Sequence, residues 1–360
     1  MKILQLIHKI QNRGAETFAC QLSNQLLSLG HEIKMVSIYN GEATLPYEEE
    51  IIILDEQSSN SPINYRGWKK LAQIIKEFNP DLIQANSGDT LKYAVFSKLI
   101  FGWKSKLVFR NASEVGRYLK SPLQKGLNKF LYKNVDWVVS VSQASKKDLI
   151  SHFPFLIGRV DVVGVGLDSF DLPSPKVLKP LEKKHIVHIG GFSFEKNHKG
   201  LLDIFELLSK ERNDIHLHLI GDGPLKNEVE KIAAQKNLSD KITFYGFIND
   251  PLSYIQSGDI LVLPSIIEGL PGVILEAMLC KTPAVAFNVG GISEVLDSST
   301  GSLIIPGDNI SFVNAIVATL KQPSTDQLEK AYSLVINEFM NTQLALKFVN
   351  SYQKLVPTVE

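Results

Sequence analysis

The sequence has few cysteines and no excess of charge of either sign. Its 360 residues include two cysteines, Cys20 and Cys280, and lysine plus arginine equals aspartate plus glutamate at 38 each. Two cysteines far apart in apolar helical patterns predict reduced core residues rather than a disulfide, which favours the cytoplasm. Because the charges cancel, the chain is not a polyelectrolyte overall, and we expect no nucleic-acid partner.

Long apolar runs are also missing. No stretch of about 18 consecutive apolar residues occurs, so no membrane-spanning helix is predicted. The opening MKILQLIHKIQ has too short an apolar run for a signal peptide and no cleavage-like site. Hydrophobic content of 44% and charged content of 21% are typical of a globular protein, and the length predicts two domains.

Several motifs of phosphate and metal chemistry are absent. There is no G-x-x-x-x-G-K-[ST], which excludes a P-loop, and no G-x-G-x-x-G dinucleotide fingerprint. No D-x-D follows a predicted strand, and histidine and cysteine do not cluster at ligand spacing. Four histidines alternate within predicted strands, where we expect half-buried side chains rather than ligands: His185, His188, His216 and His218. The sequence therefore predicts no bound metal and no cofactor.

Short apolar runs alternate with helical periodicity from end to end. Runs that are apolar on both faces, followed by amphipathic helices, are typical of a parallel sheet covered by helices. In the first half the predicted strands are 2–8, 32–38, 81–85, 106–110 and 137–142, and the predicted helices are 15–30, 68–78, 90–101 and 122–133. In the second half the predicted strands are 185–190, 215–221, 241–247, 259–265, 283–287 and 302–306, each followed by a helix.

This alternation is interrupted once, at DSFDLPSPKVLKPLEKKH, where prolines and mixed charges predict a linker. The fold class is therefore α/β, with two doubly wound parallel-sheet domains. We place the first at 1–170, the linker at 171–184 and the second at 185–338. The end of the chain, 339–360, has enough apolar positions for a helix that packs on either domain, and we assign it to the first.

Glycine-containing loops follow four consecutive strands of the second domain, and the carboxyl ends of parallel strands are where ligands bind. The loops are GGFSFEKNHKG, GDGPL, the Gly246–Phe247 pair and EGLPG. In the first domain NRGAE follows the first strand and precedes a helix. We expect the two edges to face each other across a cleft and to enclose a ligand.

The residue types at these loops favour an anionic ligand. The amides from Gly269 to Val273 open a predicted helix, whose dipole favours negative charge, and Gly14 offers a similar site in the first domain. Lys196 can neutralise phosphate oxygens as a point charge. Glu268 and Glu276 flank the amides, so the segment can hold a molecule with hydroxyls at both ends and phosphate in the middle.

EGLPGVILEAMLCKTPAVAFNVGGISEVL resembles the signature region of the retaining glycosyltransferases of family four, which have the GT-B fold. The resemblance covers nearly the whole chain. RGAE with LLSLGHEIKMVSI is similar to the opening of the family, VVGVGLD to its interdomain turn and GGFSFEKNHKGLLDIF to its lysine loop, while LIGDGPLKNEVE and ITFYGF are similar to the elements that follow.

The resemblance implies roles at matching positions. Glu268 would contact hydroxyls of the transferred sugar, Glu276 the ribose hydroxyls of the nucleotide, and Lys196 the departing diphosphate. Phe247 and Ile248 would lie near the base. The remaining donor-binding residues that it implies are the loop and helix-opening positions Gly14, Gly190, Gly191, Gly223, Gly269, Leu270, Pro271 and Gly272. Pro271 has no N–H, so only the amides beside it can donate.

Two departures from the family pattern concern charge and the acceptor. The family often has an arginine where this chain has Gly191, so a second cation at the diphosphate is missing or comes from elsewhere, with Arg13 and Lys199 as candidates. The family also often has histidines after the inner strands of the first domain, where this chain has QANSGD and FRNAS. Asn86 and Asn111 can orient an acceptor but cannot act as bases. The acceptor-side candidates are Arg13, Asn86, Arg110 and Asn111.

Charge is uneven along the chain although it cancels overall. Residues 101–150 contain ten basic and three acidic residues, a formal charge of +7. A basic amphipathic segment is typical of peripheral contact with an anionic membrane, and also of an ordinary solvated helix face.

We interpret the chain as a cytoplasmic, metal-independent, hexosyltransferase-type enzyme on a UDP- or GDP-linked sugar, peripheral on the inner face of the membrane. The predicted acceptor is a lipid-linked saccharide or another envelope glycan. The alternatives are an epimerase or phosphorylase of the same fold and a non-catalytic nucleotide-binding scaffold subunit.

Overall fold

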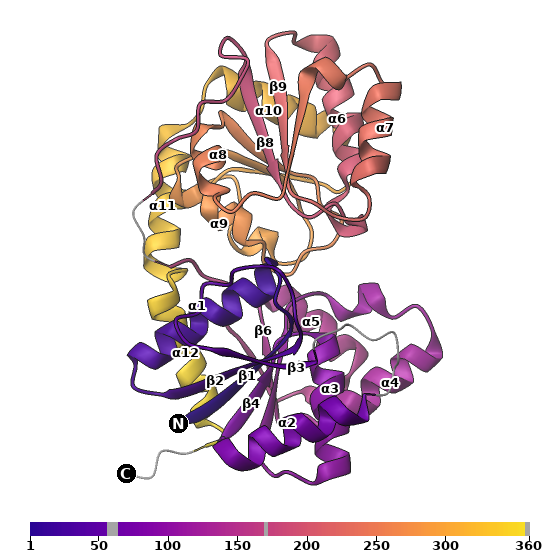
Figure 1. The fold of residues 1–360 in the computed structure, drawn as a ribbon. Helices are drawn as coiled ribbons and strands as arrows, with labels where there is room; N and C mark the ends of the chain where they lie inside the picture. Colours follow the sequence, from indigo (N-terminus) through magenta and orange to yellow (C-terminus); the bar gives the residue numbers. More distant parts are fainter. Residues whose placement is uncertain (56–63, 169–171, 357–360) are drawn as a thin grey trace. The chain divides into compact units, whose positions relative to one another are not determined.

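The computed structural model describes residues 1–55, 64–168 and 172–356 (Figure 1). The chain forms two compact units. Unit 1 comprises Met1–Asp168 and Asn341–Glu360, and unit 2 comprises Ser169–Met340. The boundary predicted at 170 and the first residue of the predicted linker lie outside the described residues. None of the helices in the described residues is long and apolar enough to cross a membrane.

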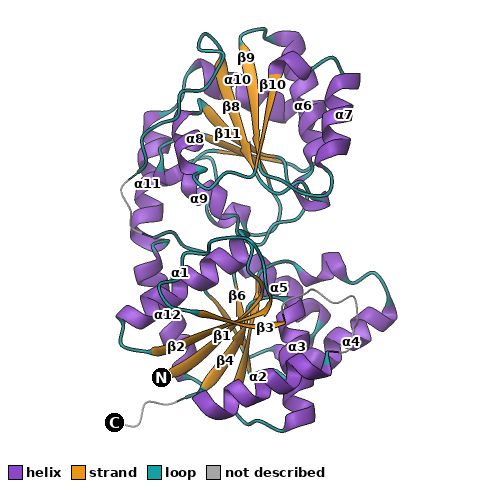
Figure 2. Ribbon diagram, viewed as in Figure 1, coloured by secondary structure: helices purple, strands orange, loops and turns teal. Residues whose placement is uncertain are grey.

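Unit 1 is a seven-stranded parallel sheet with the order β3-β2-β1-β4-β5-β6-β7. Helices lie around this sheet (Figure 2). Its strands are β1 (Lys2–Lys9), β2 (Glu32–Tyr39), β3 (Ile51–Asp55), β4 (Leu82–Ala85), β5 (Lys106–Asn111), β6 (Trp137–Ser140) and β7 (Val160–Val162). Its helices are α1 (Gly14–Ser28), α2 (Tyr65–Phe78), α3 (Gly88–Phe101), α4 (Pro122–Lys133), α5 (Gln143–His152) and α12 (Asn341–Gln353), with 3₁₀ turns η1 (Val115–Tyr118) and η2 (Pro154–Leu156).

Both faces of this sheet are buried, which explains why its strands are almost continuously apolar. Alternate strand residues point to opposite faces. Ile3, Leu82 and Val108 pack under α1 and α12, in one cluster with Phe18 and Phe348. The intervening strand residues pack on the other face, in a second cluster with residues of α2, α3, α4 and α5. Helices on both faces thus make the sheet the core of unit 1.

The last helix, α12, is joined to the sheet of unit 1 by buried polar contacts as well as apolar ones. The Tyr352 hydroxyl donates to Gln84 Oε1 at 2.6 Å. Gln84 Nε2 donates to Gln5 Oε1 at 3.2 Å, and Asn86 Nδ2 donates to the same oxygen at 2.9 Å. All four side chains are buried, with exposures of 0–2%. A segment from the end of the chain therefore completes the interior of the first sheet.

We expect Tyr352→Phe to lower the free energy of unfolding of unit 1 by about 1–3 kcal/mol, because a buried amide oxygen loses its hydrogen-bond donor. Urea denaturation followed by tryptophan fluorescence measures it, since Trp68, Trp103 and Trp137 all lie in unit 1. Tyr65→Phe is the matched control, because Tyr65 is 54% exposed and the change should cost less than about 0.5 kcal/mol. Equal midpoints for the two variants would contradict the expectation.

Unit 2 is a six-stranded parallel sheet with the order β10-β9-β8-β11-β12-β13. Its strands are β8 (Lys184–Ile189), β9 (Ile215–Ile220), β10 (Ile242–Gly246), β11 (Ile260–Leu263), β12 (Ala284–Phe287) and β13 (Ser302–Ile304). Its helices are α6 (His198–Glu211), α7 (Lys226–Gln235), α8 (Leu252–Ser257), α9 (Gly272–Leu279), α10 (Asn309–Lys321) and α11 (Thr325–Glu338), with 3₁₀ turns η3 (Phe194–Lys196), η4 (Ser239–Lys241) and η5 (Ile292–Glu294).

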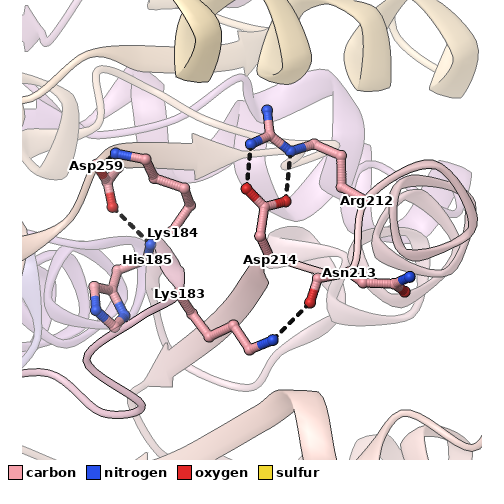
Figure 3. A network of polar contacts seen from close by, with 7 residues as sticks. All are labelled: Lys183, Lys184, His185, Arg212, Asn213, Asp214 and Asp259. Atoms are coloured by element: carbon pink, nitrogen blue, oxygen red, sulfur yellow. Dashed lines mark hydrogen bonds and ion pairs between the residues drawn. The ribbon is translucent and has the colours of Figure 1, made fainter.

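The amino edge of this second sheet is closed by paired charges (Figure 3). Asp259, just before β11, accepts from the His185 amide at 2.7 Å and pairs with Lys184 Nζ at 2.7 Å. Asp214, just before β9, accepts two hydrogen bonds from the Arg212 guanidinium. Because these charged side chains pair with one another, they stabilise the amino edge and are not available to a ligand. The glycine-rich loops lie at the opposite, carboxyl edge.

The predicted α/β class with two parallel sheets is confirmed, and four elements differ from the prediction. The helix predicted between β12 and β13 is only the 3₁₀ turn η5, because Gly290 and Gly291 precede it and a turn at Asp297 follows. Strands β3 and β7 and helix α5 were not predicted from the sequence. Two of these are short edge strands, and α5 has an alternating polar pattern with few apolar positions.

Candidate active site

The carboxyl edge of the unit 2 sheet carries the loops from which the site is built. Because the strands are parallel, the chain leaves β8, β9, β10 and β11 at the same edge. The loop after β8 contains Gly190, Gly191 and Lys196, and the loop after β11 contains Glu268 and leads into α9. The structure thus gathers the glycine loops on one side of one sheet.

The first two loops touch through their backbones. Gly221 has φ +139°, and a Cβ there would lie 2.1 Å from the Gly190 carbonyl oxygen. Gly223 has φ +158°, and its Cβ would lie 2.7 Å from the Phe192 carbonyl oxygen. Glycine is required at both positions by backbone conformation and by close approach. At Gly191 an added Cβ would meet only the Asp222 carbonyl oxygen at 3.5 Å, an ordinary contact, so packing does not require a glycine there.

Lys196 and Glu268 form an ion pair at this edge. Lys196 Nζ lies 2.6 Å from Glu268 Oε1, and the two side chains are 23% and 9% exposed. Lys196 ends the turn η3, and the next residue, Asn197, has φ +54° and donates from Nδ2 to the Pro264 carbonyl oxygen at 3.0 Å. A further bond, from the Ile266 amide to the Glu195 carbonyl oxygen at 2.8 Å, ties the two loops together. The ammonium and the carboxylate are therefore held close by their own backbones.

Between the two glutamates the chain turns into α9. The side chains of Leu270 and Pro271 are buried, so this segment presents backbone rather than side chains. Pro271 is the N-cap residue and makes no side-chain cap, which leaves the Gly272 and Val273 amides at the helix start without an intrahelical partner. Free amides at a helix N-terminus favour a bound anion.

Glu276 lies in the second turn of α9. Loss of hydration raises the pKa of this half-buried carboxyl to about 7, and the positive charge of Lys196 opposes the shift. Lys196 therefore acts electrostatically on both glutamates of the E-x7-E pair. A carboxylate with a raised pKa beside a cation is typical of functional sites.

Gly290 is a site residue that the sequence analysis did not single out. It lies in the loop after β12, has φ +56°, and a Cβ on it would lie 1.9 Å from the Glu268 carbonyl oxygen. The adjacent Gly291 amide donates to the Gly269 carbonyl oxygen at 2.7 Å. The backbone of these glycines therefore packs against the Glu268–Gly269 segment and holds it in place. The sequence does contain a signal for this site, since a glycine pair lies in the loop after the fifth predicted strand of the second domain.

Phe247 and Ile248 follow β10 at the same edge. Phe247 is 51% exposed and Ile248 is half-buried. An exposed aromatic ring next to polar loops offers a face on which a planar group can stack.

No metal centre is evident among the described residues, in which no three His, Cys, Asp or Glu side chains are arranged to hold an ion. The strand histidines contact one another, neighbouring hydroxyls or, for His188, the Val262 carbonyl oxygen. His185 Nδ1 lies 2.9 Å from His218 Nε2, and His218 Nδ1 lies 2.9 Å from the Tyr245 hydroxyl. They are more buried than predicted: His188, His216 and His218 are at most 6% exposed, and only His185 is half-buried.

Comparison with protein families matches almost the whole chain. Residues 12–169 match the model described as Glycosyltransferase Family 4, and residues 170–333 match the one described as Glycosyl transferases group 1. The chain belongs to glycosyltransferase family 4.

Relatives of this glycosyltransferase include two bacterial proteins. It is 25% identical over 312 residues to the N-acetylgalactosamine-N,N'-diacetylbacillosaminyl-diphospho-undecaprenol 4-alpha-N-acetylgalactosaminyltransferase of Campylobacter jejuni, covering 84% of this chain and 82% of that one. It is 24% identical over 332 residues to the capsular polysaccharide biosynthesis glycosyltransferase CapH of Staphylococcus aureus, covering 88% and 86%.

Solved structures show that the glycosyltransferase has the GT-B fold. HepE of Anabaena in complex with UDP-glucose superimposes with a TM-score of 0.82 at 19% identity, covering 98% of this chain and 100% of that one. Sucrose-phosphate synthase of Thermosynechococcus elongatus superimposes with a TM-score of 0.80 at 19% identity, covering 99% of each chain.

In unit 1 the glycosyltransferase presents Arg13 and Gly14 at the start of α1. Both are exposed, Arg13 makes no side-chain cap, and an added Cβ on Gly14 would meet nothing within 4 Å. The space beside this helix start is therefore open to a ligand, while Gly14 itself is not required by packing.

The other acceptor-side candidates are buried in unit 1. Asn86, Arg110 and Asn111 are 1–2% exposed. Asn111 Nδ2 donates to Ser140 Oγ at 3.2 Å, and the Arg110 guanidinium carbon lies 4.2 Å from the centre of the Phe18 ring. Burial lowers the pKa of Arg110 to about 10, partly offset by the nearby Tyr352 and Glu16. In this structure these side chains contact neighbours within unit 1, and contact with an acceptor stays a prediction.

Lys199, a candidate for the second cation, is exposed and pairs with Glu228 Oε1 at 2.6 Å. The structure therefore gives Lys199 a partner of its own in unit 2, and the role at the diphosphate also stays a prediction.

Proposed function

We propose that this glycosyltransferase moves a sugar from a UDP- or GDP-linked donor to an acceptor hydroxyl, with retention at the anomeric carbon and without a metal ion. The observation that carries the proposal is the pairing of Lys196 with Glu268, four residues before the free amides of α9, with Glu276 in the second turn of the same helix. Cation, amides and two carboxylates are the groups that a diphosphate between two polyols requires.

The Lys196–Glu268 pair would rearrange when the donor binds. In the free protein the ammonium is neutralised by Glu268. A diphosphate at the start of α9 would take over the ammonium, and the released carboxylate would then accept hydrogen bonds from hydroxyls of the sugar. Glu276 would accept from the ribose hydroxyls, and Phe247 and Ile248 would lie against the base. Glycines 190, 191, 223, 269 and 272 would let the donor approach the backbone.

The same groups act on the reaction. As the bond between the sugar and the diphosphate breaks, negative charge accumulates on the leaving phosphate. Lys196 and the amides of α9 are fixed where that charge develops, so they stabilise the transition state more than the bound donor. The leaving phosphate would take the proton of the acceptor hydroxyl on the same face of the sugar. No base from the protein and no metal is then needed.

Product analysis tests this function. The protein is incubated with UDP- and GDP-sugars, with and without a lipid-diphosphate-linked saccharide, and the products are identified by NMR. The proposal predicts acceptor-dependent release of UDP or GDP and a glycoside with the anomeric configuration of the donor. Conversion of the donor to an isomeric nucleotide sugar without acceptor would identify an epimerase, and an inverted product would exclude retention.

A lipid-linked or envelope glycan acceptor is supported by relatives whose names include a diphospho-undecaprenol acceptor and capsular polysaccharide biosynthesis. The formal charge of +7 in residues 101–150 supports peripheral contact with the inner face of an anionic membrane, with the protein itself in the cytoplasm.

We expect EDTA to leave transfer unchanged within about twofold, because peptide dipoles and Lys196 supply the charge that a metal would otherwise supply. Initial rates of UDP or GDP release are measured after dialysis against EDTA and again after Mg²⁺ or Mn²⁺ is added back. A rate that is lost with the chelator and restored by either ion would contradict metal independence.

We expect donor affinity to fall as the pH is lowered below about 7. In the protein without donor, burial raises the pKa of the Glu276 carboxyl to about 7. Only the ionised carboxylate accepts hydrogen bonds from two hydroxyls. Below pH 7 the carboxyl is protonated and must lose its proton before the donor binds, which weakens binding. The dissociation constant for UDP-glucose or GDP-mannose should rise toward tenfold per pH unit below 7 and level off above pH 8.

Calorimetry with the intact nucleotide sugar measures this, since its diphosphate has no proton that titrates in this range. The isosteric variant Glu276→Gln should bind more weakly and lose the pH dependence. A steep profile that persists in Glu276→Gln would assign the titration to another group.

A further inference from the structure

Helix α4 of unit 1 packs against its own unit with very few residues. Of its 12 residues, only Leu131 and Tyr132 are buried. It is nevertheless a well-formed helix: Ser121 Oγ accepts from the Gln124 amide at 3.2 Å, and Pro122 begins the first turn. The rest of the helix is exposed or half-buried, and it is not polar throughout.

One side of that surface is an exposed apolar stripe. Leu123, Leu127 and Phe130 are 85%, 40% and 42% exposed. At 3.6 residues per turn, these positions fall within an arc of about 60° of the helix. Phe130 also lies 6.3 Å, between ring centres, from Phe96 of the neighbouring helix α3. Exposed apolar side chains that gather in this way mark an interaction surface rather than scattered surface residues.

The other side of the exposed surface is a row of lysines. Lys125, Lys129 and Lys133 recur every four residues, so they form a line along the helix beside the apolar stripe. No acidic residue occurs between Glu114 and Asp136. No ion pair involves these three lysines in the described part of the chain, whereas lysines of the α6 and α7 region pair with carboxylates. The line of lysines is therefore uncompensated.

Charge is also divided between the two units. Unit 1 has 23 lysine and arginine residues against 17 aspartate and glutamate, and unit 2 has 15 against 21. The excess of unit 1 thus comes from residues 101–150, of which α4 is the most exposed helix. An apolar stripe next to an uncompensated basic row is complementary to an anionic lipid surface, where the stripe meets acyl chains and the lysines meet headgroups.

We propose that α4 is an interfacial helix that docks unit 1 on an anionic membrane, with Leu123, Leu127 and Phe130 inserted and Lys125, Lys129 and Lys133 at the headgroups. The helix and η1 follow the carboxyl end of β5, the strand on which Arg110 and Asn111 lie. Docking by α4 would bring that edge of unit 1 to the membrane, where a lipid-linked acceptor is held. This last step rests on the proposed transfer activity. Docking itself deepens the proposed membrane contact of residues 101–150 and does not depend on that activity.

Vesicle flotation with the full chain tests the proposal. The wild-type protein should float with phosphatidylcholine vesicles that contain phosphatidylglycerol and stay in solution with phosphatidylcholine alone. Lys125→Gln/Lys129→Gln should weaken partitioning about 25-fold, or about fivefold per lysine. Leu123→Ser/Leu127→Ser should weaken it more than about tenfold, because two inserted side chains are lost. Raising the salt concentration should weaken the wild type and affect the lysine variant less.

Matched controls come from unit 2. Lys231→Gln/Lys321→Gln removes the same charge from exposed positions, and Ile310→Ser removes an apolar side chain that is 61% exposed. Both should float like the wild type. Absence of flotation on anionic vesicles, or equal losses in the α4 and control variants, would overturn the proposal. So would sedimentation that shows a wild-type dimer and monomeric α4 variants, because a second copy would then cover the stripe.

A readout without membrane separates this proposal from the proposed function. All variants should bind UDP-sugar or GDP-sugar in calorimetry as the wild type does, because α4 is not among the donor-binding residues. A protein that floats but neither binds nor turns over a nucleotide sugar would leave docking intact and remove the function. A protein that transfers sugar to a soluble acceptor but never floats would support the proposed transfer activity and exclude membrane docking by α4.

Discussion

Lys196→Ala is expected to lower sugar transfer about 100- to 1000-fold while the protein stays folded. The ammonium lies 2.6 Å from Glu268 Oε1 and acts electrostatically on Glu276, at the edge where the donor is proposed to bind. Removal of one fixed donor from a developing anion costs about 2.7–4 kcal/mol of transition-state stabilisation, which corresponds to this range of rates. Turnover with saturating donor and acceptor measures it.

Two controls separate catalysis from folding. Lys281 is another lysine of unit 2, and its Nζ lies 2.6 Å from Oε1 of Glu329, an exposed residue of α11. Lys281→Ala should therefore leave turnover unchanged. Lys196→Ala leaves Glu268 unpaired while only 9% exposed, which itself destabilises the fold. The double variant Lys196→Ala/Glu268→Gln removes that unpaired charge and should remain as slow. Near-wild-type transfer by Lys196→Ala would exclude the lysine from the reaction.

Gly290→Ala is expected to lower transfer by about 100-fold or more, although residue 290 contributes no side chain to the site. A methyl group there would lie 1.9 Å from the Glu268 carbonyl oxygen, so the backbone of the Glu268 segment must move. A displacement of about 1 Å of a positioning group is sufficient for a hundredfold loss. The Glu268 carboxylate would no longer lie against Lys196, and weaker binding of the nucleotide sugar should accompany the slower transfer.

Gly158→Ala is the matched control for this variant. Gly158 also has a left-handed backbone, at φ +82°, but an added Cβ would meet nothing within 4 Å. Both variants carry the conformational cost of a positive φ at alanine, of order 1 kcal/mol. Only Gly290→Ala adds the collision. Equal transfer rates for the two variants would show that Gly290 does not position Glu268.

The local pattern of the chain predicts much of the fold and of the site edge. The strand of residues 106–110 and the helix of residues 122–133 lie where their hydrophobic spacing predicts them, as β5 and α4. Parallel strands deliver successive loops to one edge, so Lys196, Gly223 and Glu268 could be assigned to the same edge before any distance was known.

Contacts between distant segments were beyond the reach of local patterns. The Lys196–Glu268 pair joins residues 72 apart, and the collision that requires Gly290 depends on where two loops meet in space. The burial of Arg110 was also beyond a local pattern, since a charged residue near a strand end is ordinarily exposed. The Phe18 ring and α12 enclose it instead, and α12 comes from the far end of the chain. Tertiary packing alone determines such burial.

A crystal structure of the protein with UDP or GDP tests the central claim most directly. The account predicts the diphosphate at the start of α9, with a phosphate oxygen within hydrogen-bond distance of Lys196 Nζ, and Glu276 accepting from the ribose hydroxyls. Glu268 should then be released from the lysine. A nucleotide bound away from this edge, or a Lys196–Glu268 pair that persists with the nucleotide present, would contradict it.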